Sequence, residues 1–159
     1  MKYNINEYVV FRKDVCKIKE VKEINNKQYY VLTPITDESL IINIPSNNEN
    51  IRRIISKEES LNIIDSIPSI EPIEFNEKNI ENLYKELLRT GSHKDLIRII
   101  KTSYHRNKER KENNKRLGDK DSTYFAKAEK YLYNELMISL DMTNEELKSF
   151  MKERLENKK

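Results

Sequence analysis

The sequence predicts an α+β protein, with a small antiparallel β-barrel of SH3 or Tudor type followed by an all-helical domain of about five helices. The first 45 residues contain short runs rich in valine, isoleucine and tyrosine, separated by turn residues. After Ser56, apolar residues recur three and four positions apart, as on helix faces. A chain of 159 residues can form one medium domain or two small ones. We therefore predict a β domain over residues 1–54 and a helical domain over residues 55–159.

Four or five short antiparallel strands are predicted in the β domain, and the runs that indicate them cover residues 8–11, 15–24, 28–35 and 40–44. Asn25 and Asn26 indicate a hairpin turn between the second and third runs, because asparagine tolerates the left-handed backbone of tight turns. Pro45 is expected to end the fourth run, since proline cannot donate to a strand ladder. Short strands with tight turns favour a small barrel.

The predicted last strand is the first candidate binding surface. If Leu40, Ile42 and Ile44 fill the core, Ile41 and Asn43 face the other way. Ile41 then either stays exposed, where an edge strand can pair with a strand of another protein, or packs against the helical domain. The sequence leaves both alternatives open.

Helix boundaries are indicated by capping residues and prolines. Ser56 has capping-box spacing at the start of the first helix, and Pro68 is expected to end it. Asn76 is the predicted N-cap of the second helix and Gly91 its C-cap, while Thr143 begins the fifth with another capping box. The predicted buried stripes of the third and fourth helices are Leu96, Ile97, Ile100 and Tyr104, and Phe125, Ala128, Leu132 and Leu136.

No motif for catalysis or for a cofactor is found. The two glycines are too few for a phosphate-binding loop, and the two histidines lack the spacing of a metal site. The only cysteine, Cys16, is predicted to be a buried structural thiol, which fits a reducing compartment. We expect a cytoplasmic protein that is not an enzyme, with no cofactor, no metal, no small-molecule ligand and no membrane span.

A basic stretch is the second candidate binding surface. Between Lys94 and Lys120 there are ten Lys or Arg residues and four Asp or Glu residues, a net charge of about +6 in a chain whose overall charge is +3. Such an asymmetry suits a polyanion such as nucleic acid, and a solvated helix face is the alternative.

Phe75 is the third candidate, and it has two interpretations. In the first it is a hydrophobic staple, packing on Ile80 beside the N-cap Asn76. In the second it is an aromatic wedge for a base step in a DNA minor groove.

Several short motifs occur in a characteristic order along the chain. They are EYVVF at residues 7–11, YYVL at 29–32, INIP at 42–45, NL at 82–83 with LLRTG at 87–91, ER at 109–110, FAKA at 125–128 and EL at 135–136. In their order and spacing these motifs resemble the CarD family of bacterial RNA-polymerase-binding transcription regulators, whose N-terminal module is shared with transcription-repair coupling factors.

The resemblance implies a β domain that docks on the RNA polymerase β subunit and a helical domain that touches the promoter DNA minor groove at the upstream edge of the transcription bubble, weakly when alone. Phe75 stands where the family has a wedge aromatic, usually Trp, which favours the wedge interpretation. The main alternative is a polymerase- or repair-linked adaptor without DNA contact. The implied polymerase-binding residues are Ile41, Asn43, Pro45 and Lys22, and the implied DNA-binding residues are Phe75, Lys78, Lys85, Arg116 and Lys120.

Overall fold

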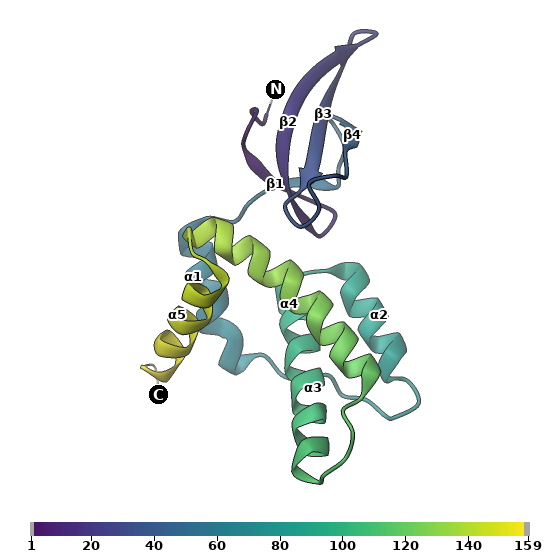
Figure 1. Ribbon diagram of the computed structural model, residues 1–159, viewed down its shortest axis with the longest axis vertical. Helices are drawn as coiled ribbons and strands as arrows, with labels where there is room; N and C mark the ends of the chain where they lie inside the picture. The colour runs from purple at the N-terminus through teal and green to yellow at the C-terminus, as the bar shows by residue number, and fades with distance from the viewer. Residues whose placement is uncertain (1, 158–159) are drawn as a thin grey trace. The chain divides into compact units, whose positions relative to one another are not determined.

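A computed structural model describes residues 2–157, and it shows an α+β chain in which a five-stranded antiparallel sheet is followed by five α-helices (Figure 1). The chain forms two compact units, the first ending at Ser56 and the second beginning at Lys57. Within the described residues, no helix is both long enough and apolar enough to cross a membrane.

The sheet of the first unit is open. Its strands lie in the order β4-β3-β2-β1-β5, with every neighbouring pair antiparallel. Since β4 and β5 are the two edges and do not pair with each other, the sheet does not close, and the barrel predicted from the sequence is not formed. The sequence pattern does not reveal β5, because this strand has only three residues and two of them are charged. The strands are β1 (Tyr8–Phe11), β2 (Asp14–Ile24), β3 (Lys27–Pro34), β4 (Ile42–Pro45) and β5 (Ile51–Arg53).

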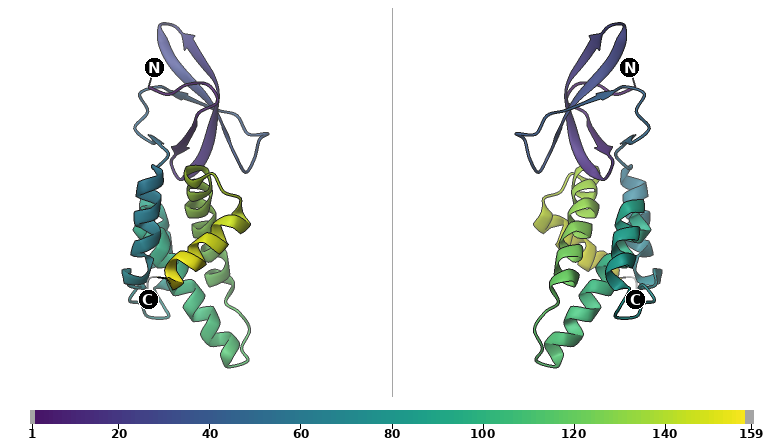
Figure 2. Two further views of the ribbon diagram at one scale, coloured as in Figure 1. Left: turned by 90° about the vertical axis from the view of Figure 1, so that its left-hand side faces the viewer. Right: turned by 90° about the vertical axis from the view of Figure 1, so that its right-hand side faces the viewer.

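The hairpin of β2 and β3 forms the centre of this sheet, and Figure 2 shows its long, twisted ribbon. Asn25 and Asn26 connect the two strands with φ values of 52° and 65°, so the predicted turn is confirmed. Both residues lie in the left-handed region, as a type I′ turn requires. A bulge between Ile18 and Glu20 shifts the register of β2 against β3.

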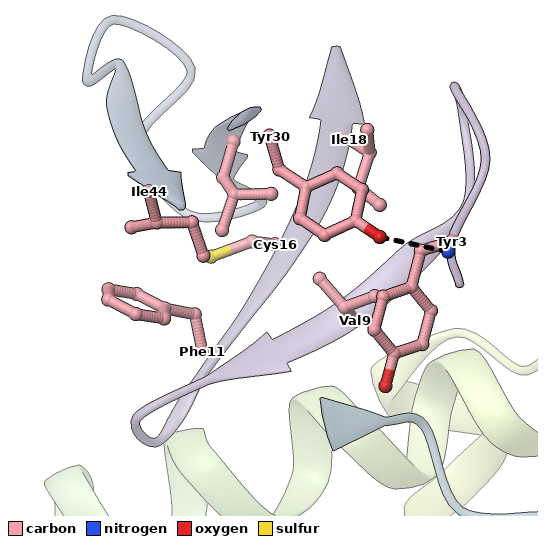
Figure 3. Packing of buried hydrophobic residues seen from close by; sticks show 8 residues of the cluster. Tyr3, Val9, Phe11, Cys16, Ile18, Tyr30 and Ile44 are labelled. Carbon is pink, nitrogen blue, oxygen red and sulfur yellow. Dashed lines mark hydrogen bonds between the residues drawn. The ribbon is translucent and has the colours of Figure 1, made fainter. Parts of the chain in front are cut away.

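Aromatic and aliphatic side chains fill one face of the sheet (Figure 3). The hydroxyl of Tyr30 accepts a hydrogen bond from the backbone N–H of Tyr3 at 3.1 Å, which satisfies a polar atom inside this cluster. Cys16 is buried, as predicted, and burial together with the nearby Asp14 charge raises the pKa of its thiol to about 11. The cluster consists of Tyr3, Val9, Phe11, Cys16, Ile18, Tyr30, Leu32 and Ile44.

The fourth strand differs from its prediction at both ends. Leu40 was expected in the core but is 47% exposed and precedes the strand. The cause is Thr33, whose hydroxyl lies 2.5 Å from the Leu40 carbonyl and 3.2 Å from the Glu38 carbonyl and holds this segment in a loop. Pro45 was expected to stop the strand but is its last residue, which an edge strand tolerates.

The second unit is a helical bundle. In Figure 1, α3 and α4 run side by side, α2 packs against α3, and α1 contacts both α4 and α5. The bounds are α1 (Lys57–Ser66), a 3-10 turn (Ile67–Ser69), α2 (Ile80–Thr90), α3 (His93–Glu112), α4 (Asp119–Leu140) and α5 (Asn144–Glu156).

Three of the predicted helix boundaries are confirmed. Gly91 caps α2 in the left-handed conformation at φ 62°. Thr143 and Glu146 form the predicted capping box of α5. Pro68 falls in the 3-10 turn just after α1.

Two predictions about the helices are wrong. α2 begins at Ile80 rather than directly after Asn76, because the Asn76 side chain accepts hydrogen bonds from the N–H groups of Lys78 and Asn79 and forms a local turn. Tyr104 does not belong to the buried stripe of α3, since it is 57% exposed. Thr102 and Ser103 are buried on that helix instead.

Candidate docking edge and nucleic-acid interface

β4 presents an unoccupied row of backbone groups at one edge of the first unit. The N–H of Ser46 bonds to the carbonyl of Gln28, and the register continues through Ile44 opposite Tyr30. Hydrogen-bonded pairs alternate along an antiparallel ladder. Asn43, opposite Val31, therefore directs its N–H and carbonyl away from β3. Asn43 offers one donor and one acceptor to an added strand.

The ends of this edge limit how a partner can pair. Pro45 is also directed outward by the alternation, and it supplies a carbonyl but no N–H. An added strand therefore meets a donor at Asn43 and none at Pro45. This arrangement disfavours unspecific pairing with other strands, and it limits a specific partner to a short stretch of backbone hydrogen bonds.

The loop before β4 displays two apolar side chains. Ile41 is 65% exposed, and Leu40 beside it is also exposed. The loop has a defined conformation, because Thr33 binds its carbonyls and the Asp37 carboxylate accepts hydrogen bonds from the N–H and hydroxyl of Ser39. The backbone that carries the two side chains therefore has a fixed path next to the open edge.

The other predicted docking residues lie on one face of the sheet. Lys22 pairs across the strands with Tyr29, and Tyr29 pairs with Pro45, so the three share a cross-strand row. Asn43, two residues from Pro45, lies on the same face. Lys22, Asn43 and Pro45 are all exposed, and Ile41 directly precedes the strand.

In the second unit, the segment carrying Phe75 is fastened to α3. Ile70 and Ile73 are buried. The N–H of Ile73 donates to the Thr102 hydroxyl at 2.8 Å, and the ammonium of Lys101 donates to the carbonyl of Ile70 at 2.7 Å. The extended residues before Phe75 therefore have a fixed path over the helix.

Phe75 itself is 40% exposed, and its ring contacts a cation. The guanidinium carbon of Arg106 lies 4.6 Å from the ring centroid, within cation–π range. The staple interpretation fails, because α2 begins at Ile80 and Phe75 is therefore not the residue before its N-cap. The ring instead has one face on Arg106 and part of its surface in solvent.

Arg106 is also the centre of a buried ionic network. Its Nε lies 3.0 Å from both carboxylate oxygens of Asp121, and its terminal nitrogens lie 3.0 and 3.2 Å from the carboxylate of Glu77. Asp121 also accepts hydrogen bonds from the Tyr84 hydroxyl at 2.6 Å and from Arg110. Since Asp121 is 1% exposed, its charge depends on these partners.

The electrostatics of the network follow from burial and pairing. Burial alone would raise the pKa of Asp121, but the hydrogen bonds from Tyr84, Arg110 and Arg106 lower it below its ordinary value. The pKa of Tyr84 is raised, first by burial and then by its bond to Asp121. Bonding to Arg106 lowers the pKa of Glu77. The carboxylates are therefore ionised at neutral pH.

Several cations of the basic stretch bind within the protein. Arg106 and Arg110 are held by Asp121, and Lys101 by a backbone carbonyl. Lys120 lies 2.7 Å from Glu81, and Lys85 lies 3.3 Å from the same carboxylate. The excess charge read from the sequence therefore overstates what is available to a polyanion.

The structure separates the predicted DNA-binding residues into groups. Lys85 and Lys120 come together at Glu81. Lys78 lies in the turn after Phe75, and Arg116 lies in the loop between α3 and α4, both exposed. Phe75 lines a cavity of about 300 Å³ together with Arg106, Arg110 and Lys115. Arg116 is not part of that lining.

The Asp121 network was missed at the sequence level. Arg106 and Arg110 stand four residues apart, which places them on one helix face, and this spacing is the signal for a shared acidic partner. Nothing in the sequence distinguishes Asp121 from its neighbour Asp119 in the first turn of α4. Among the residues described, no group of three His, Cys, Asp or Glu side chains is placed to hold a metal ion.

No protein-family model matches this chain, and no curated protein matches it. Its function is therefore inferred from the geometry of the two units together with the motifs in the sequence.

Proposed function

We propose that this chain is a non-catalytic transcription regulator of the CarD type, which binds the RNA polymerase β subunit and promoter DNA at the same time. In this proposal the open sheet is a Tudor-like polymerase-docking module. The observation that carries the proposal is the free edge of β4, where the outward backbone of Asn43 lies beside the exposed side chain of Ile41.

Strand addition explains why this edge suits a protein partner. An added strand would bond to the Asn43 backbone, while its side chains would cover Ile41 and Leu40, which are otherwise in water. Backbone pairing gives affinity and the apolar pair gives register. Asn43 supplies both bonds from its main chain, so the contact does not depend on a charged side chain at this position.

Phe75 supports the DNA half of the proposal. Its ring is partly exposed on a segment that is fixed by Thr102 and Lys101, and Arg106 stacks on it. An aromatic in a fixed position can insert at a base step and unstack it, which favours the open promoter. Docking through β4 would raise the local concentration of Phe75 near the DNA, so weak binding by the free protein is sufficient.

The polymerase contact is tested by binding to the isolated β lobe. Asn43→Pro removes the outward N–H without changing the hydrogen bonds between β4 and β3. We expect at least a tenfold loss of affinity, because the added strand loses a backbone hydrogen bond and the register that this bond sets. Asn43→Ala is the matched control, because it keeps the backbone donor. Equal affinity of the two variants, with both folded, would exclude strand addition at this edge.

An adaptor that binds protein only is the second candidate, and one observation favours it. Arg106, Arg110 and Lys120 already have carboxylate partners inside the protein. The test is a complex of polymerase with fork-junction DNA, to which the chain is added. An adaptor would bind that complex and polymerase alone equally well, whereas the regulator would bind the DNA-containing complex more tightly.

A further inference from the structure

The second unit has a groove that the proposed function does not use. It lies between the C-terminal half of α3 and the start of α4, with a volume of about 660 Å³. Tyr104 and Leu117, which line it, are both exposed, and Phe125 is a half-buried member of the lining. Lys108 and Lys111 are also part of the lining.

The exposure of Tyr104 has no explanation within the fold. The residue follows the apolar stripe of α3 by spacing, yet 57% of it is in solvent. A helix turn of 3.6 residues places Tyr104, Lys108 and Lys111 along one face. Arg106, Arg110 and Asn113, which line the Phe75 cavity, fall on the opposite face of the same helix. The two surfaces therefore lie on different faces of α3. They are linked through the hydrogen bond from Arg110 to Asn107, but Tyr104, Lys108 and Lys111 can be altered without changing a residue that lines the Phe75 cavity.

The charges at the groove favour an anionic occupant. Lys108 and Lys111 are exposed, and in the described part of the chain neither is engaged in an ion pair. This distinguishes them from Arg106, Arg110 and Lys120. Glu112 is the one carboxylate among the lining residues, so the lining keeps a net positive charge.

The remaining polar groups of the groove are mostly hydrogen-bond donors. The amide oxygen of Asn107 already accepts from the N–H of Gly118 at 2.8 Å and from Arg110 at 2.7 Å. Its Nδ2 donates once, to the Ser122 hydroxyl at 3.1 Å, which leaves a second N–H and the hydroxyl proton to donate. A flat aromatic wall, spare donors and two free cations complement a planar group rich in acceptors that is attached to a phosphate.

We propose that this groove binds an unpaired nucleotide of single-stranded nucleic acid, with the base stacked on Tyr104 and the flanking phosphates on Lys108 and Lys111. Aromatic platforms combined with cations are the usual means of holding single strands without reading their sequence. This inference rests on the proposed function in that both require nucleic acid, but it concerns a different face of α3 and a different form of DNA.

The absence of tryptophan in the chain provides a direct probe. Tyr104→Trp introduces the only tryptophan of the chain into the groove. A single-stranded oligothymidylate of about 12 nucleotides, within the usual site size, should quench it saturably, whereas the matched duplex should not. His105→Trp is the control, because it puts the same fluorophore at the next exposed position of α3, outside the lining. Its fluorescence should not change.

The affinity for the same oligothymidylate, now carrying a fluorescent label, gives an independent measurement. Tyr104→Ala should weaken it roughly 5- to 150-fold, the range of one lost stacking contact, and Tyr104→Phe should retain it. Lys108→Gln with Lys111→Gln should reduce the salt slope by about 0.7 per lysine.

The outcomes separate this inference from the proposed function. If fork-junction DNA binds in a Phe75-dependent way but Tyr104→Trp is not quenched by the single strand, the groove assignment is wrong and the proposed function stands. If no nucleic acid binds the full chain, both are wrong. A spectral change with polyglutamate and none with the oligonucleotide would assign the groove to an acidic protein segment and overturn the inference.

Discussion

The guanidinium carbon of Arg106 lies 4.6 Å from the centroid of the Phe75 ring, while the same guanidinium bonds to the buried carboxylate of Asp121. The exposed aromatic is therefore connected to the interior of the helical unit through one side chain. Tyr84 of α2 binds the same carboxylate, so α2, α3 and α4 meet there. The orientation of Phe75 depends on that meeting point, although the ring itself is far from fully buried.

Removing the buried charge should destabilise the helical unit strongly. Asp121→Asn leaves Arg110 without its ionic partner and Arg106 with the exposed carboxylate of Glu77 alone, and breaking a buried pair costs about 3–5 kcal/mol. Urea unfolding monitored by circular dichroism measures the loss. Glu77→Gln is the matched control, since that carboxylate is exposed and its pair with Arg106 is expected to contribute less than about 1 kcal/mol. Equal effects of the two changes would contradict a dominant role for Asp121.

The same carboxylate should give a defined pH dependence. The pKa of Asp121 is lowered in the folded protein, so its contribution to stability is fully present above the unfolded pKa of about 3.9 and is lost as the pH falls through the lower folded value. We expect the difference in Tm between the wild type and Asp121→Asn to be constant from neutral pH down to about pH 5 and to shrink below about pH 4. A difference that grows on acidification would reverse the assigned sign.

Binding of the free protein to fork-junction DNA should be weak and salt-dependent. Among residues 2–157, exposed cations without a carboxylate partner remain at Lys78, Lys115 and Arg116, in addition to the groove lysines. If roughly three to five phosphates are engaged, log K should fall with log salt at a slope of about −3 to −5. The measurement is a fluorescence-anisotropy titration with fork-junction DNA over a range of salt concentrations.

A pair of variants checks which cations contribute to that slope. Arg116→Gln should reduce its magnitude by about 0.9 if the residue meets a phosphate. Lys120→Gln should change it less, because Lys120 is held by Glu81 at 2.7 Å. A slope near zero for the wild type would remove the electrostatic component of DNA binding altogether.

The features predicted correctly from the sequence depend on neighbouring residues. The Asn25–Asn26 turn and the capping box of Thr143 and Glu146 require contacts within four positions of the chain, so their residue types suffice to predict them. The start of α2 has a local cause too, but Asn76 can bond either a helix terminus or a turn, and it forms the turn.

The features that were missed depend on contacts between distant residues. Arg106 and Asp121 lie fifteen positions apart, and only the packing of α3 on α4 shows that the arginine binds inside the protein rather than to a phosphate. The exposure of Leu40 likewise follows from the hydroxyl of Thr33 on another strand. Periodicity assigns faces to elements, but it does not show which polar groups pair across them.

The last prediction concerns Phe75 and separates a DNA wedge from a residue with a purely structural role. Phe75→Ala should cost only about 1 kcal/mol of folding free energy, since the ring is 40% exposed and its main partner is a cation at its face. The same change should shorten the lifetime of open promoter complexes, because the unstacked base step loses its aromatic partner.

Phe75→Trp should have the opposite effect on that lifetime. The larger ring covers more of a base step and can still stack on Arg106. The pair of measurements is thermal unfolding and the decay of open complexes after a competitor is added. The wedge predicts that the decay of open complexes becomes slower from alanine through phenylalanine to tryptophan at this position, with little change in Tm. A large loss of stability in Phe75→Ala, with the decay rate unchanged for the folded protein, would instead make Phe75 a structural residue that merely covers Arg106.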